Sequence, residues 1–81
     1  MTEGSVSPVP LTDLPVGSTA VVEGLEGEPS FQKRLADLGL IPGISIRFIR
    51  KAPFGDPIEI ELRGYRLAIR KADAQKILVV S

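Results

Sequence analysis

Residues 58–69 read IEIELRGYRLAI, two runs of alternating apolar and polar side chains joined by an Arg-Gly pair. Alternation with a period of two is typical of strands that bury one face. A two-residue turn fixes the pairing, with Leu62 opposite Tyr65. Glu61 then lies opposite Arg66, so the apolar pairs share one face and opposite charges meet on the other. Because a slip of one residue would destroy both matches, we predict a β-hairpin in this register.

A helical spacing precedes the hairpin. Phe31, Leu35 and Leu38 follow the pattern i, i+4, i+7, which predicts one apolar stripe of a short helix over residues 30–38. Ser30 is the expected N-cap of this helix. Gly39 is the expected left-handed residue that ends it, which would bring the next side chain back onto the helix.

The remaining segments predict further strands. Residues 18–23, 44–48 and 77–80 are rich in β-branched or alternating apolar side chains, and residues 71–76 can form one helical turn. About five short strands with one helix are enough for a small, strongly bent barrel. We therefore predict an all-β fold with one short helix, an SH3-like barrel. An OB-fold is the nearest alternative, because it also closes five strands and carries one helix.

Length and charge limit the function. The 81 residues fit one domain, and we expect residues 1–10 to be a flexible N-terminal tail and residues 11–81 to be the folded domain. The 10 basic and 10 acidic residues cancel, so the whole chain does not attract nucleic acid or anionic lipid over long distances. We find no signal-peptide pattern and no apolar run near the ~20 residues that a membrane helix needs. We expect a cytoplasmic protein without direct membrane insertion.

The chain has no histidine and no cysteine. These residues most often serve as general base, nucleophile or transition-metal ligand, so we predict no catalytic residue, no metal site and no cofactor. Carboxylates are the remaining option. Glu59 and Glu61 share one strand face, but the hairpin register gives Glu61 a basic neighbour and a structural explanation. Glu26 and Glu28 are interpreted as acidic loop residues at the surface.

Three motifs resemble a known family. Residues 33–43, KRLADLGLIPG, resemble the Arg-Leu-x-x-Leu-Gly-Leu-x-Pro-Gly motif of the ferrous iron transport protein A (FeoA) family. Residues 52–58, APFGDPI, resemble that family's Ala-Pro-x-Gly-Asp-Pro-Ile loop, and residues 64–70, GYRLAIR, resemble its final hairpin strand. The resemblance extends from Leu11 to Val80. The structural motif residues that we mark in it are Arg34, Leu35, Leu38, Gly39, Gly43, Gly64 and Arg70.

The resemblance implies a small cytosolic SH3-like adaptor or regulator of bacterial ferrous iron uptake. It would act by contact with the membrane GTPase permease FeoB, which would recruit it to the inner face of the membrane. The resemblance also implies a general association of the family with transition metal ion binding. Its oligomeric state stays open. The alternative is a small β-barrel that binds nucleic acid, but Phe31, Phe48 and Tyr65 are assigned to the core and leave no platform for stacked bases.

We predict one contact surface from the chemistry of two segments. Its residues are Ile41, Pro42, Pro53, Phe54, Gly55, Asp56 and Pro57. The prolines at 53 and 57 restrict the loop before binding, so less entropy is lost on contact. Phe54 could fill a pocket of a partner, and Asp56 could fix the orientation. The competing interpretation is turn chemistry, with Phe54 plugging the barrel end and Asp56 bonded to its own backbone.

Overall fold

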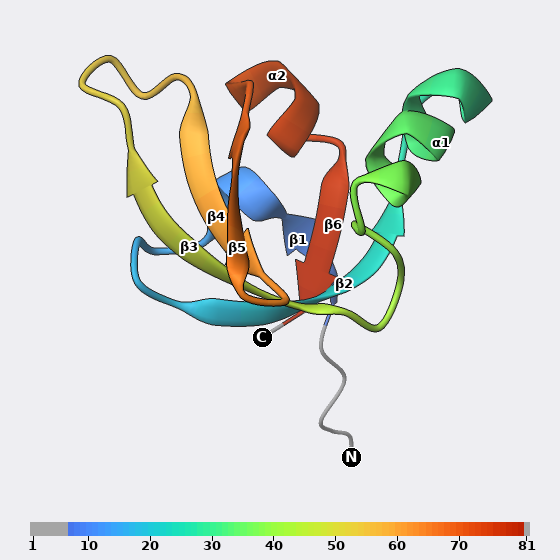
Figure 1. The fold of residues 1–81 in the computed structure, drawn as a ribbon, viewed down its shortest axis with the longest axis horizontal. Helices are drawn as coiled ribbons and strands as arrows, with labels where there is room; N and C mark the ends of the chain where they lie inside the picture. Colours follow the sequence, from blue (N-terminus) through green and yellow to red (C-terminus); the bar gives the residue numbers. More distant parts are fainter. Residues whose placement is uncertain (1–6, 81) are drawn as a thin grey trace.

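A six-stranded antiparallel sheet forms most of the computed structural model, which describes residues 7–80. The strands follow the order β1-β6-β2-β3-β4-β5 across the sheet. The sheet bends strongly, so that β3, β4 and β5 form one wall and β1 and β6 the opposite wall (Figure 1). The strand bounds are β1 (Val9–Pro10), β2 (Thr19–Leu25), β3 (Ser45–Lys51), β4 (Ile58–Leu62), β5 (Tyr65–Ile69) and β6 (Ile77–Val80). This small bent barrel confirms the predicted all-β class.

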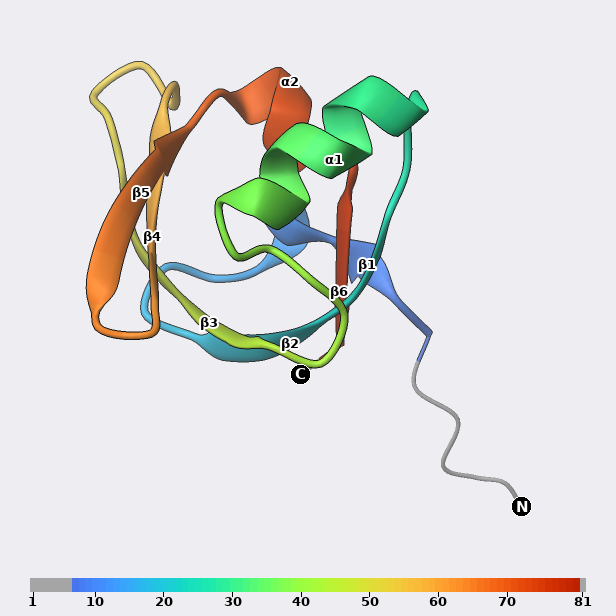
Figure 2. The same ribbon diagram turned by 45° about the vertical axis from the view of Figure 1, so that its right-hand side comes forward.

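Two α-helices and one 3-10 turn complete the fold. Their bounds are η1 (Leu11–Asp13), α1 (Pro29–Asp37) and α2 (Lys71–Ala74). Both helices lie toward the upper end of the bent sheet, away from the C-terminal end of β6 (Figure 2). Each helix turns a buried side chain toward the interior, Leu35 from α1 and Ala74 from α2. The helices therefore cover the parts of the core that the sheet leaves open.

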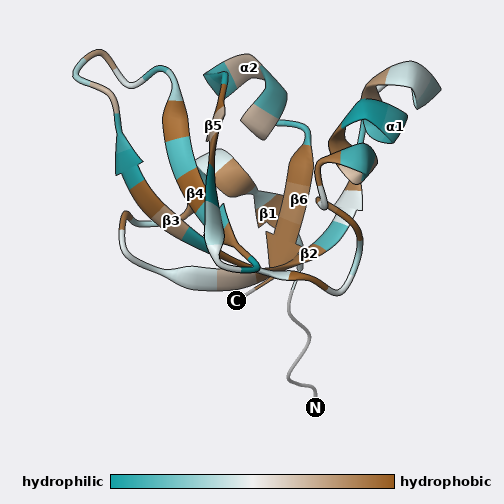
Figure 3. Ribbon diagram, viewed as in Figure 1, coloured by the Kyte–Doolittle hydropathy of each residue, from teal (hydrophilic) through white to brown (hydrophobic). Residues whose placement is uncertain are grey.

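The hairpin has the predicted register. Arg63 and Gly64 form its turn with φ angles of 49° and 83°. Two successive positive φ angles are the signature of a type I′ turn, whose twist matches that of the paired strands. The alternation of apolar and polar residues is visible along β3 and β4 (Figure 3). The observed partners are Leu62 with Tyr65, Glu61 with Arg66, Ile60 with Leu67, and Ile58 with Ile69.

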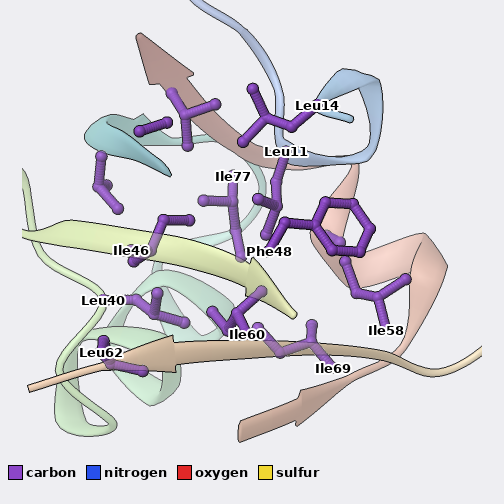
Figure 4. Packing of buried hydrophobic residues seen from close by; sticks show 14 of the residues in the cluster. Leu11, Leu14, Leu40, Ile46, Phe48, Ile58, Ile60, Leu62, Ile69 and Ile77 are labelled. Carbon is purple, nitrogen blue, oxygen red and sulfur yellow. The ribbon is translucent and has the colours of Figure 1, made fainter. Parts of the chain in front are cut away.

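The core is wholly apolar. Among the described residues, no polar or charged side chain is buried. Phe48 on β3 is fully buried and lies near Leu11 and Ile58 at one end of the core (Figure 4). Burying each such large side chain contributes roughly 1.5 to 3 kcal/mol. Burial of apolar surface is therefore the main source of stability.

Helix α1 ends as predicted but begins differently. Gly39 has φ 101°, and its N–H donates to the carbonyl of Ala36 at 2.9 Å. The N–H of Leu40 donates to the carbonyl of Leu35 at 3.0 Å, which completes a Schellman ending. The predicted N-cap is wrong, because Ser30 lies inside the helix. The observed N-cap is Glu28, which makes no side-chain cap bond, and the helix starts at proline, whose missing N–H has no cost at the first position.

The predicted tail boundary also needs correction. Val9 and Pro10 form β1 and pair with Val79 and Leu78 of the last strand. Proline is compatible with this edge position because its missing N–H can face away from the ladder. Residues 1–6 lie outside the described part of the chain, and their assignment to a tail stays a prediction.

Candidate functional site

The loop between β3 and β4 holds an aromatic ring away from the protein. Within residues 52–57, the N–H of Gly55 donates to the carbonyl of Ala52 at 2.7 Å. The N–H of Ala52 donates to the carbonyl of Pro57 at 2.9 Å. These bonds close the loop, and Phe54 at its tip is 98% exposed. The ring therefore does not plug the barrel end, and the structural alternative for Phe54 is wrong.

Asp56 ties this loop to helix α2. Its Oδ1 accepts a hydrogen bond from the backbone N–H of Lys71 at 3.0 Å. The N-cap residue Arg70 makes no side-chain cap bond. Asp56 thus satisfies one of the N–H groups that a helix start leaves open, instead of bonding to its own loop backbone. This carboxylate has a structural use that sequence reasoning missed, because its partner lies in another element.

The loop protrudes instead of forming a pocket. The cavity beneath it has a volume of about 50 Å³ and is lined by Thr12, Phe48, Lys51, Gly55, Ile58 and Lys71. Small-molecule sites usually have volumes of about 300 to 1,000 Å³, so this cavity is too small for one. A second hollow, of about 310 Å³, reaches the lower end of this range, but its lining consists of the exposed residues Asp56, Pro57 and Arg70. It is an open depression of the surface and does not enclose a ligand. The loop shape suits insertion into a pocket of another protein.

A second group of exposed apolar side chains lies at the end of α1. Leu38, Ile41 and Tyr65, here called the helix-end patch, are 42%, 39% and 42% exposed. The Tyr65 hydroxyl donates to the carbonyl of Leu38, which holds the ring over the helix end. Sequence reasoning placed Leu38 and Tyr65 in the core, and both assignments are wrong. The helix turns Leu38 outward, and the polar hydroxyl keeps Tyr65 at the surface.

The predicted single contact surface is divided in two. Strand β3 has 7 residues, which corresponds to roughly 20 Å at about 3.3 Å per residue. Ile41 and Pro42 precede this strand, whereas the loop 53–57 follows it, so the two segments lie at opposite ends (Figure 1). The structure therefore corrects the prediction that they act together.

Arg34 lies in a small group of charges around an aromatic ring. Its guanidinium is 3.7 Å from the carboxylate of Asp73 and 5.5 Å from the centre of the Phe31 ring. The ammonium of Lys76 lies 4.9 Å from the same ring centre. These contacts connect α1 to the C-terminal segment. The Arg34 side chain is 64% exposed, however, and its role as a structural anchor stays a prediction.

The other motif residues lie at turns and at a helix start, where they set the course of the backbone. Gly43 has φ 93°, and its N–H donates to the carbonyl of Val22 at 2.8 Å, which sets the entry to β3. Gly64 completes the hairpin turn, and Arg70 is the exposed N-cap of α2. None of these positions carries a reactive group.

Residues 7–80 contain neither a metal-binding cluster nor a membrane-spanning helix. Over this range no group of three or more His, Cys, Asp or Glu residues is placed to hold a metal ion. Glu59 pairs with Arg50 at 3.1 Å, which accounts for one of the two strand carboxylates. None of the described helices is long and apolar enough to cross a membrane.

Comparison with known proteins identifies relatives along nearly the whole described chain. A family model described as the FeoA domain matches residues 9–81. A relative from Porphyromonas gingivalis (strain ATCC BAA-308 / W83) is 35% identical over 69 residues. That relative is an Fe(2+) transport protein A/Fe(2+) transporter FeoB fusion protein. The match covers 85% of this chain but 8% of the fusion protein, so the chain spans a small part of that relative's length.

Solved structures share the fold. A FeoA-like protein from Clostridium acetobutylicum is 38% identical with a TM-score of 0.81, covering 89% of this chain and 84% of that protein. FeoA from Stenotrophomonas maltophilia, complexed with zinc and described as a prokaryotic SH3 domain protein, is 28% identical. Its TM-score is 0.73, with 94% of this chain and 89% of that chain covered. The predicted SH3-like fold is confirmed.

Proposed function

This chain belongs to the FeoA family of ferrous iron transport, and we propose that it is an accessory domain that binds a FeoB-type transporter by protein contact. The observation that carries the proposal is the fusion relative, in which an FeoA segment and a FeoB transporter occupy one polypeptide. A covalent link raises the effective concentration of two binding surfaces, often to the millimolar range. Such a fusion is advantageous when the two domains bind each other.

The proposed mechanism requires no chemistry of the domain itself. With no histidine and no cysteine in the chain, binding to the transporter is the action that its side chains support best. The domain would work at the cytoplasmic face of the membrane, where the transporter holds it. Contact there changes the transporter only if the domain binds one of its conformations more tightly than another.

Phe54 is the proposed anchor of this contact. Its ring is 98% exposed, so no part of the described fold gains from keeping a large aromatic residue at this position. Aromatic residues that enter a desolvated pocket are frequent hot spots of binding energy. Asp56 fixes the base of the loop through its bond to α2, so the loop loses little freedom when Phe54 binds.

Affinity capture from membrane extracts of the source cell tests the proposal. The tagged chain serves as bait, and the bound proteins are identified after a moderate-salt wash. We expect recovery of a FeoB-type transporter. Recovery of nucleic acid in its place, with a steep loss of binding as salt rises, would instead support the nucleic-acid alternative.

A further inference from the structure

Positive charge is concentrated on strand β5 and the residues at its two ends, although the protein as a whole is neutral. Residues 63–71 read RGYRLAIRK, which contains four of the chain's 10 cations and no acid. All four, Arg63, Arg66, Arg70 and Lys71, are exposed. Across the hairpin, Glu61 faces Arg66 and compensates one of them. Asp56 lies beside Lys71 and Arg70 and compensates a second. The remaining two charges give the strand and its ends a net positive field, which the balanced charge of the whole chain conceals.

The same strand is an edge of the sheet. Within residues 7–80, β5 pairs with β4 alone and ends the strand order. Figure 2 shows β5 at the outer side of the wall that it forms with β4. The opposite edge, β1, has only 2 residues and includes Pro10, a common protection against further pairing. The 5 residues of β5 include no proline, so this edge can accept another strand.

The hairpin register shows which backbone groups face outward. A type I′ turn places a hydrogen bond between the residues that flank it, so Leu62 and Tyr65 form a bonded pair. Bonded and non-bonded pairs alternate along an antiparallel ladder. Arg66 and Ala68 occupy the non-bonded positions, and their N–H and C=O groups therefore point away from β4. Both residues are exposed, and no backbone hydrogen bond joins them to a described element other than β4.

We propose that the β5 edge binds an extended protein segment in which acidic and apolar residues alternate. An added strand continues the pleat of its neighbour, so every second side chain falls on the same face as Arg66. Acidic residues at those positions would lie opposite Arg66 and close to the cations at the ends of β5. The intervening side chains would lie beside Tyr65 and Leu67, which are only partly covered by the fold. Apolar residues at those positions would bury the exposed parts of Tyr65 and Leu67.

Two other occupants fit less well. A second copy of this chain would bring a second basic strand to the same edge, and like charges on neighbouring strands destabilise pairing. Nucleic acid would satisfy the charges, but it offers neither the backbone groups of a strand nor alternating apolar side chains for Leu67. The proposal does not involve the Phe54 ring, so it can fail while binding of the transporter through Phe54 holds.

The test uses a ten-residue peptide of alternating glutamate and valine, titrated into the full chain by nuclear magnetic resonance. A control peptide has the same composition with the glutamates and valines in two blocks. We expect the alternating peptide to bind at least ten-fold more tightly. It should also slow amide hydrogen exchange at Arg66 and Ala68, because an added strand covers these N–H groups.

Substitution of Ala68 isolates the strand contact. Ala68→Pro removes an N–H that β4 does not use, and we expect it to weaken binding at least ten-fold. Ala68→Val keeps the N–H and is the matched control, with binding within about three-fold of wild type because valine favours strands. If the proline variant does not fold, Arg66→Glu is the second variant. It should reduce binding of the glutamate peptide and create binding of a lysine-valine peptide.

Several results would overturn the proposal. These are equal binding of both peptides, protection elsewhere than β5, and unchanged binding by a folded Ala68→Pro chain. Displacement of the peptide by an oligothymidine of equal charge would assign the edge to nucleic acid. Protection of Arg66 and Ala68 that rises with protein concentration in the absence of peptide would assign it to a second copy.

Discussion

Gly39→Ala is expected to destabilise the fold through two separable effects. Gly39 has φ +101°, and a Cβ there would lie 3.0 Å from Tyr65 Oη and 3.3 Å from Leu62 Cδ1. Gly43 has a similar φ of +93° but no heavy atom within 4 Å of its Cβ position. The two glycines thus share a backbone conformation and differ in the space around it. Gly43→Ala is therefore the matched control for backbone strain.

The expected magnitudes follow from this comparison. A non-glycine residue in the left-handed region costs about 1 to 2 kcal/mol, which we assign to both substitutions. At Gly39 the new methyl group also displaces the Tyr65 hydroxyl, and a lost hydrogen bond adds about 0.5 to 1.5 kcal/mol. One kcal/mol lowers the melting temperature of a domain of this size by about 4 to 8 °C. Gly39→Ala should thus lower it by roughly 6 °C or more, and Gly43→Ala by clearly less.

The assay is urea and thermal unfolding followed by circular dichroism, with both alanine variants in wild-type and Tyr65→Phe backgrounds. Removing the hydroxyl relieves the close contact, so Gly39→Ala should cost less in the Tyr65→Phe background, whereas the cost of Gly43→Ala should not change. Equal costs for the two glycines in both backgrounds would refute the contact argument. An unchanged melting temperature in Gly39→Ala would refute its role as the helix stop.

Three further predictions concern the loop, the charges and iron. Asp56→Ala should lower the free energy of unfolding by about 0.5 to 2 kcal/mol, because the cap on the Lys71 N–H is lost. Asp56→Asn keeps an acceptor oxygen and should cost less. Equal unfolding midpoints for the two variants would argue against the cap. Arg34→Ala should cost no more than about 1 kcal/mol, because its pairing with Asp73 is exposed, and a larger loss would make Arg34 an anchor. Calorimetry with Fe²⁺ should give no stoichiometric submicromolar binding, since the chain lacks imidazole and thiolate, and such binding would contradict our interpretation.

Sequence reasoning predicted correctly those features that depend on interactions between residues close together in the chain. The hairpin register follows from two alternating runs and the turn at Arg63 and Gly64, all within 12 consecutive residues. The end of α1 follows from Gly39 alone. Such features are visible in a sequence because the interacting groups are neighbours along the chain.

The incorrect predictions concern partners that are distant in sequence. Val9 becomes a strand residue because Val79 lies beside it, and Tyr65 stays at the surface because the Leu38 carbonyl accepts its hydroxyl. The predicted contact surface is two separate surfaces in the structure, because the length of β3 separates Phe54 from Ile41. Spacing within a segment does not report how folded segments are placed relative to one another.

Binding of the purified chain to a purified FeoB-type transporter in lipid nanodiscs tests the central claim most directly. The comparison uses wild type, Phe54→Ala and Val16→Ala, the last removing an apolar side chain that is 54% exposed outside the loop. We predict saturable binding by wild type and by Val16→Ala, and at least about ten-fold weaker binding by Phe54→Ala with an unchanged melting temperature. No saturable binding by wild type would contradict the adaptor function. Equal binding by Phe54→Ala would show that the contact lies elsewhere.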